Sequence, residues 1–151
     1  MEKNRKIALQ RHLDLEKKEM DQMLDVGWQD NTVEIYRDEY MVLTEEEANE
    51  MCERYIKDNL WAFNAEFILN HCNNSEMDNW EWDAAKTALQ EAQGRFAESL
   101  NGLVRALIYN MDEFVDDAIC EDGRGHFLAS YDGYENEEMV DGVTYYIYRL
   151  I

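Results

Sequence analysis

The chain contains no proline in 151 residues, and this absence fits a protein with long helices. No proline-rich linker, internal repeat or low-complexity block divides the chain, and its length is typical of one domain. The sequence therefore predicts a single domain that spans residues 1–151.

Cysteine is scarce as well. Cys52, Cys72 and Cys120 are odd in number and show no Cys-x-x-Cys spacing, which argues against a disulfide framework or a zinc ribbon. We interpret them as reduced thiols of the core. The sequence also shows no signal-peptide pattern and no run of ~20 apolar residues, so we expect a cytoplasmic protein that does not bind a membrane.

Basic residues are few, since 14 lysines and arginines stand against 34 aspartates and glutamates, for a net charge of −20. Residues 1–18 carry six cations and three acids, so the rest of the chain carries −23. Nucleic acid and anionic membranes are poor partners for such a chain, because binding them requires clustered lysine and arginine. The surplus costs folding stability through self-repulsion, and it favours a basic protein as the partner.

The chain does have enough apolar side chains to fold. Hydrophobic residues make up 46% of it, including 4 Trp, 9 Tyr and 5 Phe, which argues against disorder. Apolar residues recur at helical spacing over residues 3–25 and predict an N-terminal helix that ends near Gly27. We leave open that residues 1–27 lie at the periphery of the fold.

Three segments have the composition of β-strands. Residues 32–36 and 40–43 flank a polar turn at 37–39 and predict a hairpin. Residues 143–150 are β-branched and aromatic, so they are the third strand of a small antiparallel sheet.

Helices are predicted for most of the remaining chain. Thr44 and Glu47 match a capping box that begins a helix, with a break near residues 58–59 and a very apolar segment at 60–72. A further pattern runs over 79–110 as one helix or two, and the last helix ends at Asp122-Gly123, where a loop follows. The predicted fold class is α+β, mostly helical, with about three antiparallel strands.

The densest acidic run lies in the last predicted helix. At helical spacing, residues 112 and 116 form an i,i+4 pair, as do 113 and 117, and their like charges repel. Carboxylates on adjacent turns lie roughly 6 Å apart, comparable with phosphates along a nucleic-acid strand, so the run can imitate a phosphate track. The alternative is a solvated helix face. The candidate partner-binding residues are this run and three acids of a loop at 135–141: Asp112, Glu113, Asp116, Asp117, Glu121, Asp122, Glu135, Glu137 and Glu138.

The glycine-rich stretch at 122–133 holds a second set of candidate residues, namely Arg124, His126, Tyr131 and Asp132. His126 could serve as a base oriented by Asp132, but no nucleophile motif or oxyanion loop accompanies them. The alternative is a tight loop in which Arg124 pairs with neighbouring carboxylates and His126 bonds backbone carbonyls.

No pattern predicts a metal or a cofactor. The acids after Asp132 do not follow the EF-hand loop, and the sequence has no His-Glu-x-x-His or paired Glu-x-x-His motif. His12 and His71 fall on predicted helices, where we expect packing or capping roles. Trp80 and Trp82 point to different sides of a helix, so one of them is a candidate contact residue.

Two stretches carry a resemblance: Tyr-Ile-Lys-Asp-Asn-Leu-Trp-Ala-Phe-Asn at 55–64, and Asp-Gly-Arg-Gly-His-Phe-Leu-Ala-Ser-Tyr-Asp-Gly at 122–133 followed by Tyr-Tyr-Ile-Tyr-Arg at 145–149. Together they resemble small acidic proteins of bacteriophages and mobile elements. The resemblance implies a phage accessory protein, and such proteins often inhibit host defences by occupying nucleic-acid-binding clefts. It makes a CRISPR effector or a restriction enzyme the implied target.

We therefore expect a non-catalytic inhibitor, without a cofactor, that binds a basic groove of a nucleic-acid-handling protein. Two other classes stay open. One is an adaptor or structural protein of phage replication that docks through its basic N-terminal helix, and the other is an enzyme that uses His126, Asp132 and Tyr131. The sequence also leaves a homodimer open.

Overall fold

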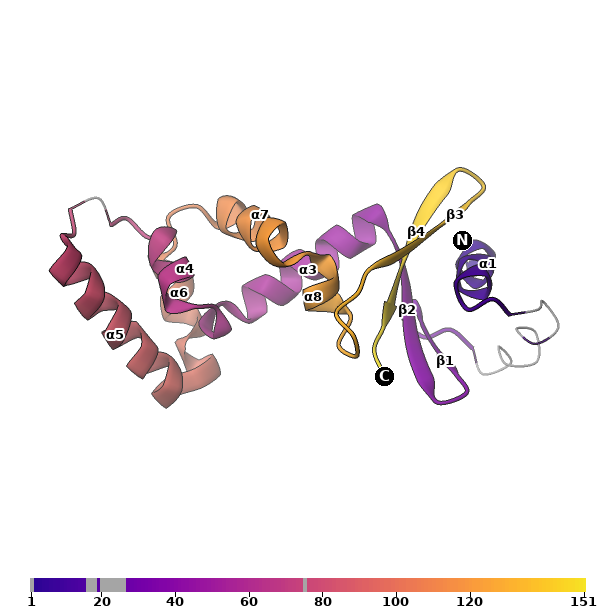
Figure 1. Cartoon of the computed structure of the whole chain (residues 1–151), viewed down its shortest axis with the longest axis horizontal. Helices are drawn as coiled ribbons and strands as arrows, with labels where there is room; N and C mark the ends of the chain where they lie inside the picture. Colours follow the sequence, from indigo (N-terminus) through magenta and orange to yellow (C-terminus); the bar gives the residue numbers. More distant parts are fainter. Residues whose placement is uncertain (1, 16–18, 20–26, 75) are drawn as a thin grey trace. The chain divides into compact units, whose positions relative to one another are not determined.

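A computed structural model describes residues 2–15, 19, 27–74 and 76–151 of the protein (Figure 1). Its chain divides into two units, of which unit 1 comprises Met1–Cys52 with Asp122–Ile151 and unit 2 comprises Glu53–Glu121. The single domain that the sequence predicts stays a prediction. In the part of the chain that is described, no helix combines the length and the apolar character needed to cross a membrane.

Unit 1 is built on four antiparallel strands in the order β1-β2-β4-β3. The α+β class is confirmed, but the sheet has one strand more than the sequence analysis predicts. Val140 pairs with Val143, so Asp141 and Gly142 form a two-residue turn with φ angles of +52° and +78°. An Asp-Gly pair between two strands is a strong hairpin signal and could have predicted the additional strand. The strands are β1 (Thr32–Ile35), β2 (Asp38–Thr44), β3 (Asn136–Val140) and β4 (Val143–Arg149).

The turn of the first hairpin is shorter than the predicted turn at 37–39. Ile35 pairs with Asp38, which leaves Tyr36 and Arg37 as the turn, with Tyr36 at a φ of +62°. Asp38 belongs to β2 instead, and its carboxylate lies 2.8 Å from the guanidinium of Arg149 on β4. This ion pair fixes the end of the sheet where the hairpin turns.

Helix α1 (Glu2–His12) covers one face of this sheet, where Ala8 and Leu9 have no exposed surface. Arg5 is 3% exposed, and its guanidinium donates two hydrogen bonds to Glu47, of 2.8 and 2.7 Å, and one to the carbonyl of Val42. Arg5, Ala8 and Leu9 of α1 are therefore buried against the sheet, and a peripheral position of residues 1–27 as a whole stays a prediction. The helix ends earlier than predicted, and most of residues 13–25, including the apolar positions at 20–24, lies outside the described residues.

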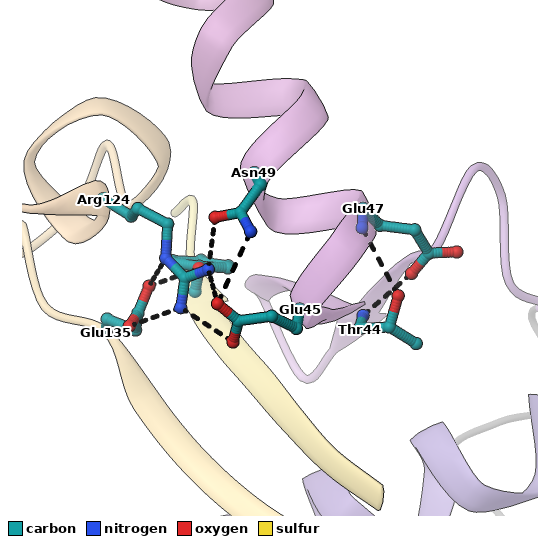
Figure 2. A network of polar contacts seen from close by, with 7 residues as sticks. Thr44, Glu45, Glu47, Asn49, Arg124 and Glu135 are labelled. Carbon is teal, nitrogen blue, oxygen red and sulfur yellow. Dashed lines mark hydrogen bonds and ion pairs between the residues drawn. The ribbon is translucent and has the colours of Figure 1, made fainter. Parts of the chain in front are cut away.

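Helix α3 (Glu45–Asp58) begins at the predicted capping box. The Thr44 amide donates to the Glu47 carboxylate at 2.8 Å, and the Glu47 amide donates to the Thr44 hydroxyl at 3.4 Å (Figure 2). The helix ends at the break predicted for residues 58–59.

Unit 2 is helical throughout its regular elements. Asn64 splits the apolar segment at 60–72, because its side chain accepts a hydrogen bond of 2.9 Å from the Glu66 amide and so begins a new helix. The helical pattern predicted for residues 79–110 is interrupted at Ala97, which has a φ of +48°, and not at Gly94 or Gly102. The elements are η2 (Leu60–Ala62), α4 (Ala65–Asn70), α5 (Asn79–Phe96), η3 (Ala97–Leu100), α6 (Asn101–Leu107) and α7 (Met111–Asp122), whose last residue belongs to unit 1.

The three cysteines do not share one environment. Cys52 is fully buried, and this burial raises the pKa of its thiol to about 11. Cys72 is half-buried, whereas Cys120 is exposed on α7, so the prediction of a core thiol is wrong for Cys120.

The loop predicted after Gly123 contains a short helix, α8 (Arg124–Leu128). Gly125 of α8 packs against the chain at 133–135 so closely that an added Cβ would lie 2.5 Å from the Gly133 carbonyl oxygen and 2.8 Å from the Glu135 nitrogen. Both contacts are with backbone, so a larger side chain would push the two segments apart.

We expect Gly125→Ala to lower the free energy of unfolding by about 1–3 kcal/mol, the usual cost of overpacking. Gly94→Ala is the matched control, because Gly94 lies inside α5 with open space at its Cβ, and alanine there should add about 0.5–1 kcal/mol. Urea unfolding followed by circular dichroism measures both. Equal stability of the two variants would contradict the packing described.

Candidate functional site

Helix α7 is held in place by an aromatic cluster inside unit 2. The Phe114 side chain has no exposed surface, and its ring centroid lies 5.1 Å from that of Phe63, 4.9 Å from that of Phe67 and 5.0 Å from that of His71. Val115 and Ala118 are buried beside it. These three residues define the inner face of α7 and fix the rotation of the helix about its axis.

The opposite face of α7 is acidic. We call it the acidic face and define it by five exposed carboxylates: Asp112, Glu113, Asp116, Asp117 and Glu121. The helix contains no lysine or arginine, and none of the five forms an ion pair with a lysine or arginine among the described residues. Asp122, the sixth predicted acid of this run, is also exposed at the end of the helix.

This arrangement costs stability. Three i,i+4 pairs of like charge follow each other at 112/116, 113/117 and 117/121, and each destabilises a helix by about 0.2–0.5 kcal/mol. Glu121 and Asp122 also lie in the last turn, where the helix dipole is negative and where no basic residue compensates. The acidic face is therefore maintained against its own electrostatics by the packing of the inner face.

His71 joins the segment after α4 to the acidic face. Its Nδ1 lies 2.8 Å from the Phe67 carbonyl oxygen, and its Nε2 lies 2.8 Å from a carboxylate oxygen of Asp117. Both ring nitrogens of His71 are therefore engaged by acceptor oxygens within unit 2. Neither nitrogen is left to act as a general base.

A groove lies beside the acidic face, with a volume of about 720 Å³. We call it the α7 groove. One wall is the segment at 67–74, and the other is α7 with Tyr109, whose side chain is 83% exposed. The Tyr109 amide donates a 2.8 Å hydrogen bond to the His71 carbonyl, which fixes the chain at the mouth of the groove. The residues that line the groove include Phe67, His71, Tyr109, Glu113, Asp117 and Glu121.

The predicted acids at 135–138 belong to unit 1 and do not form a loop. Glu137 and Glu138 lie on strand β3, where Glu137 is exposed and Glu138 is half-buried. Glu135 is committed to the protein itself, because its carboxylate accepts hydrogen bonds from Arg124 and from the buried Tyr148 hydroxyl. That Glu135 contacts a partner stays a prediction, although its carboxylate already accepts these hydrogen bonds inside unit 1.

Arg124 is enclosed by acceptors of unit 1 (Figure 2). Its guanidinium donates to Glu135 at 2.8 and 3.0 Å, to Glu45 at 3.0 Å and to Asn49 at 2.8 Å, and it lies 4.3 Å from the ring centroid of Tyr146. Burial alone would lower the pKa of Arg124, but its bonds to Glu135 and Glu45 outweigh burial and raise it. The prediction that Arg124 pairs with carboxylates is confirmed, and its role is structural.

The other candidates of the glycine-rich stretch do not form a catalytic arrangement. His126 is exposed on α8 with its ring against Phe127, while Asp132 accepts a 3.0 Å hydrogen bond from the Tyr134 amide. No hydrogen bond among the described residues joins His126 to Asp132. The third candidate, Tyr131, contacts Arg149 instead, whose guanidinium carbon lies 3.8 Å from the centroid of the Tyr131 ring. The base and its orienting group that the enzyme interpretation requires are thus not brought together.

Among the residues that the structure describes, no group of three or more histidines, cysteines, aspartates or glutamates is placed to hold a metal ion. Comparisons with protein-family models, with curated proteins and with solved structures find no match to the chain. The assignment of function therefore depends on the geometry of the site.

Two features of the site were missing from the sequence analysis. The hydrogen bond between His71 and Asp117 joins positions 46 residues apart, and no local pattern signals such a contact. Tyr109 lies at the end of the helical pattern predicted for residues 79–110, and no sequence motif marks it as a contact residue. The apolar residues 114, 115 and 118 do signal which carboxylates of α7 face outward, because they mark its buried side.

We expect Glu121→Gln to raise the free energy of unfolding by roughly 0.3–1 kcal/mol, because it removes a like-charge pair and a charge at the negative end of the helix dipole. Glu53→Gln is the control, since Glu53 lies 2.6 Å from Lys57 in an i,i+4 pair of opposite charge and its loss should cost about 0.2–0.5 kcal/mol. Thermal unfolding at low salt measures both changes in stability, which should be opposite in sign. A loss of stability in Glu121→Gln would show that its charge is compensated.

Proposed function

We propose that this protein is a non-catalytic binding protein that docks the acidic face of α7 onto the basic, nucleic-acid-binding surface of another protein and so excludes nucleic acid from it. The observation that carries the proposal is the acidic face itself, with five exposed carboxylates and no lysine or arginine partner among the described residues. A helix that served only as a solvated surface would gain stability from mixed charges.

The spacing of the carboxylates supports a nucleic-acid-like surface. Side chains three or four residues apart on a helix lie about 5–6 Å from each other at Cβ, comparable with the phosphates of one strand. A basic cleft that is built to neutralise phosphates would therefore meet charges of the same sign at a similar interval.

The state of the histidines supports binding and not catalysis. Both nitrogens of His71 are hydrogen-bonded, and His126 has no bonded carboxylate among the described residues. An adaptor that docks through the N-terminal helix is less favoured, because Arg5, Ala8 and Leu9 of α1 are buried against the sheet of unit 1.

The partner class follows from the resemblance to small acidic proteins of bacteriophages and mobile elements. We infer a host defence protein of the cytoplasm that handles nucleic acid, such as a CRISPR effector or a restriction enzyme. Its basic cleft provides the complementary charge for a chain with a net charge of −20.

The test compares the wild-type chain with a variant of the outer pair, which we define as Asp112 and Asp116. Partners are captured from host lysate at low salt and identified by mass, and the purified partner is then titrated with labelled nucleic acid. The wild-type chain should compete with the nucleic acid, and Asp112→Asn/Asp116→Asn should compete about tenfold less well, which corresponds to roughly 1.4 kcal/mol.

The matched control is Asp83→Asn/Glu91→Gln on α5, which removes the same charge from exposed positions elsewhere in unit 2. It should compete within about twofold of the wild type, a difference of less than 0.5 kcal/mol. The proposal fails if the wild-type chain leaves nucleic-acid binding by the captured partner unchanged, or if the two double variants lose the same activity.

A further inference from the structure

The carboxylates of the acidic face divide into those that line the α7 groove and those that lie outside it. Glu113, Asp117 and Glu121 follow each other at i, i+4 and i+8 and line the α7 groove, whereas Asp112 and Asp116 do not. The three groove carboxylates therefore form one row along its wall. Asp117 is bonded to His71, whereas no lysine or arginine among the described residues pairs with any of the three.

The wall of the groove that α7 forms also carries an aromatic ring, that of Tyr109. Tyr109 is 83% exposed, although a side chain of this size usually buries most of its surface. Its chain is held in place, because the Tyr109 amide bonds the His71 carbonyl at 2.8 Å and Ile108 forms a β-bridge with Cys72. The ring is thus presented by a fixed backbone next to a row of carboxylates.

A hollow with carboxylates along one wall and an exposed aromatic ring at its mouth is complementary to a cation. Its volume of about 720 Å³ falls within the range of ligand pockets and exceeds what one side chain requires. A planar guanidinium fits better than an ammonium, because it can stack on the ring and donate to more than one carboxylate at once.

We propose that the α7 groove binds the guanidinium group of one arginine of the basic partner. This inference rests on the proposed function, since it names the side chain by which the partner is held. The row of Glu113, Asp117 and Glu121 accepts the guanidinium hydrogens, and Tyr109 covers its face. The outer pair then contributes long-range attraction, while the groove supplies specificity.

The probe is N-acetyl-arginine amide, titrated into the ¹⁵N-labelled chain and followed by NMR. We expect saturable shifts of the amides of His71, Tyr109, Glu113 and Asp117 in the millimolar range. The N-acetyl-citrulline amide has nearly the same shape without the charge and should give no saturable shift. The lysine analogue should bind several-fold more weakly, and equal binding of lysine and arginine would overturn the assignment to a guanidinium.

Two matched comparisons locate the site. Glu113→Gln/Glu121→Gln, the groove pair, should abolish the saturable shifts, whereas the outer-pair variant with the same change of charge should keep them within about twofold. Tyr109→Ala leaves every carboxylate in place and should weaken arginine binding about threefold or more. The control is Trp80→Ala, which removes a ring that is 79% exposed and lies outside the groove, and it should leave arginine binding unchanged. Equal effects of the groove and outer pairs would overturn the inference.

These outcomes are separable from those of the proposed function. The titration needs no partner, so arginine can bind in the groove even if the chain fails to displace nucleic acid. Conversely, if the wild-type chain displaces nucleic acid and the groove-pair variant does so equally well, the groove inference is overturned and the proposed function stands.

Discussion

Burial of the Phe114 ring is the interaction on which the rest of the site depends. The ring packs edge-on against Phe63, Phe67 and His71 and leaves no part of itself exposed. Because a helix has one rotation in which this ring is buried, the same contact determines which side chains of α7 face outward. Truncation of a buried phenylalanine typically costs about 3–5 kcal/mol, several times the cost of one like-charge pair. The apolar packing can therefore hold a helix face whose charges repel each other.

His71 connects the two properties of this site. It belongs to the aromatic cluster on one side, and it donates a hydrogen bond to Asp117 on the other. Since its second nitrogen lies 2.8 Å from the Phe67 carbonyl oxygen, both ring nitrogens are engaged and the orientation of the ring is fixed. The side chain therefore fixes the position of the Asp117 carboxylate on the acidic face.

Unit 1 handles its charge in a different way. There two arginines with little exposed surface pair with carboxylates, Arg124 with Glu135 and Glu45 and Arg5 with Glu47. A hydrogen bond from Tyr146 lowers the pKa of Glu45, and the Arg5 guanidinium lowers the pKa of Glu47, so both carboxylates are stabilised in their charged form. Carboxylates that look alike in the sequence thus differ in their contacts: some of those in unit 1 pair with arginine, whereas the five of the acidic face have no lysine or arginine partner among the described residues.

Local patterns predicted the features that depend on neighbours in sequence. The capping box of Thr44 and Glu47 and the acidic run of α7 are of this kind, because hydrogen bonding over three residues and helical periodicity both act locally. The fold class followed from the same patterns. Strand β3 was missed because Glu137 and Glu138 have weak β propensity, although the turn at Asp141-Gly142 marked it.

Contacts between distant residues could not be predicted in this way. Glu135 looked like a surface acid until its bonds to Arg124 and Tyr148 placed it in an internal network. The break at Ala97 lacked a signal, because alanine rarely adopts a positive φ. The α7 groove combines residues from 67 to 121, and only the tertiary structure brings the segment at 67–74 to the row of carboxylates.

The central claim is that charge on one helix face guides the protein to a basic partner. The most direct measurement is the association rate constant of the complex as a function of salt, from about 0.05 to 0.5 M, where the screening length falls from roughly 14 to 4 Å. The account predicts that this rate constant falls steeply over the range while the dissociation rate constant changes little. An association rate constant that stays the same across the range would contradict it.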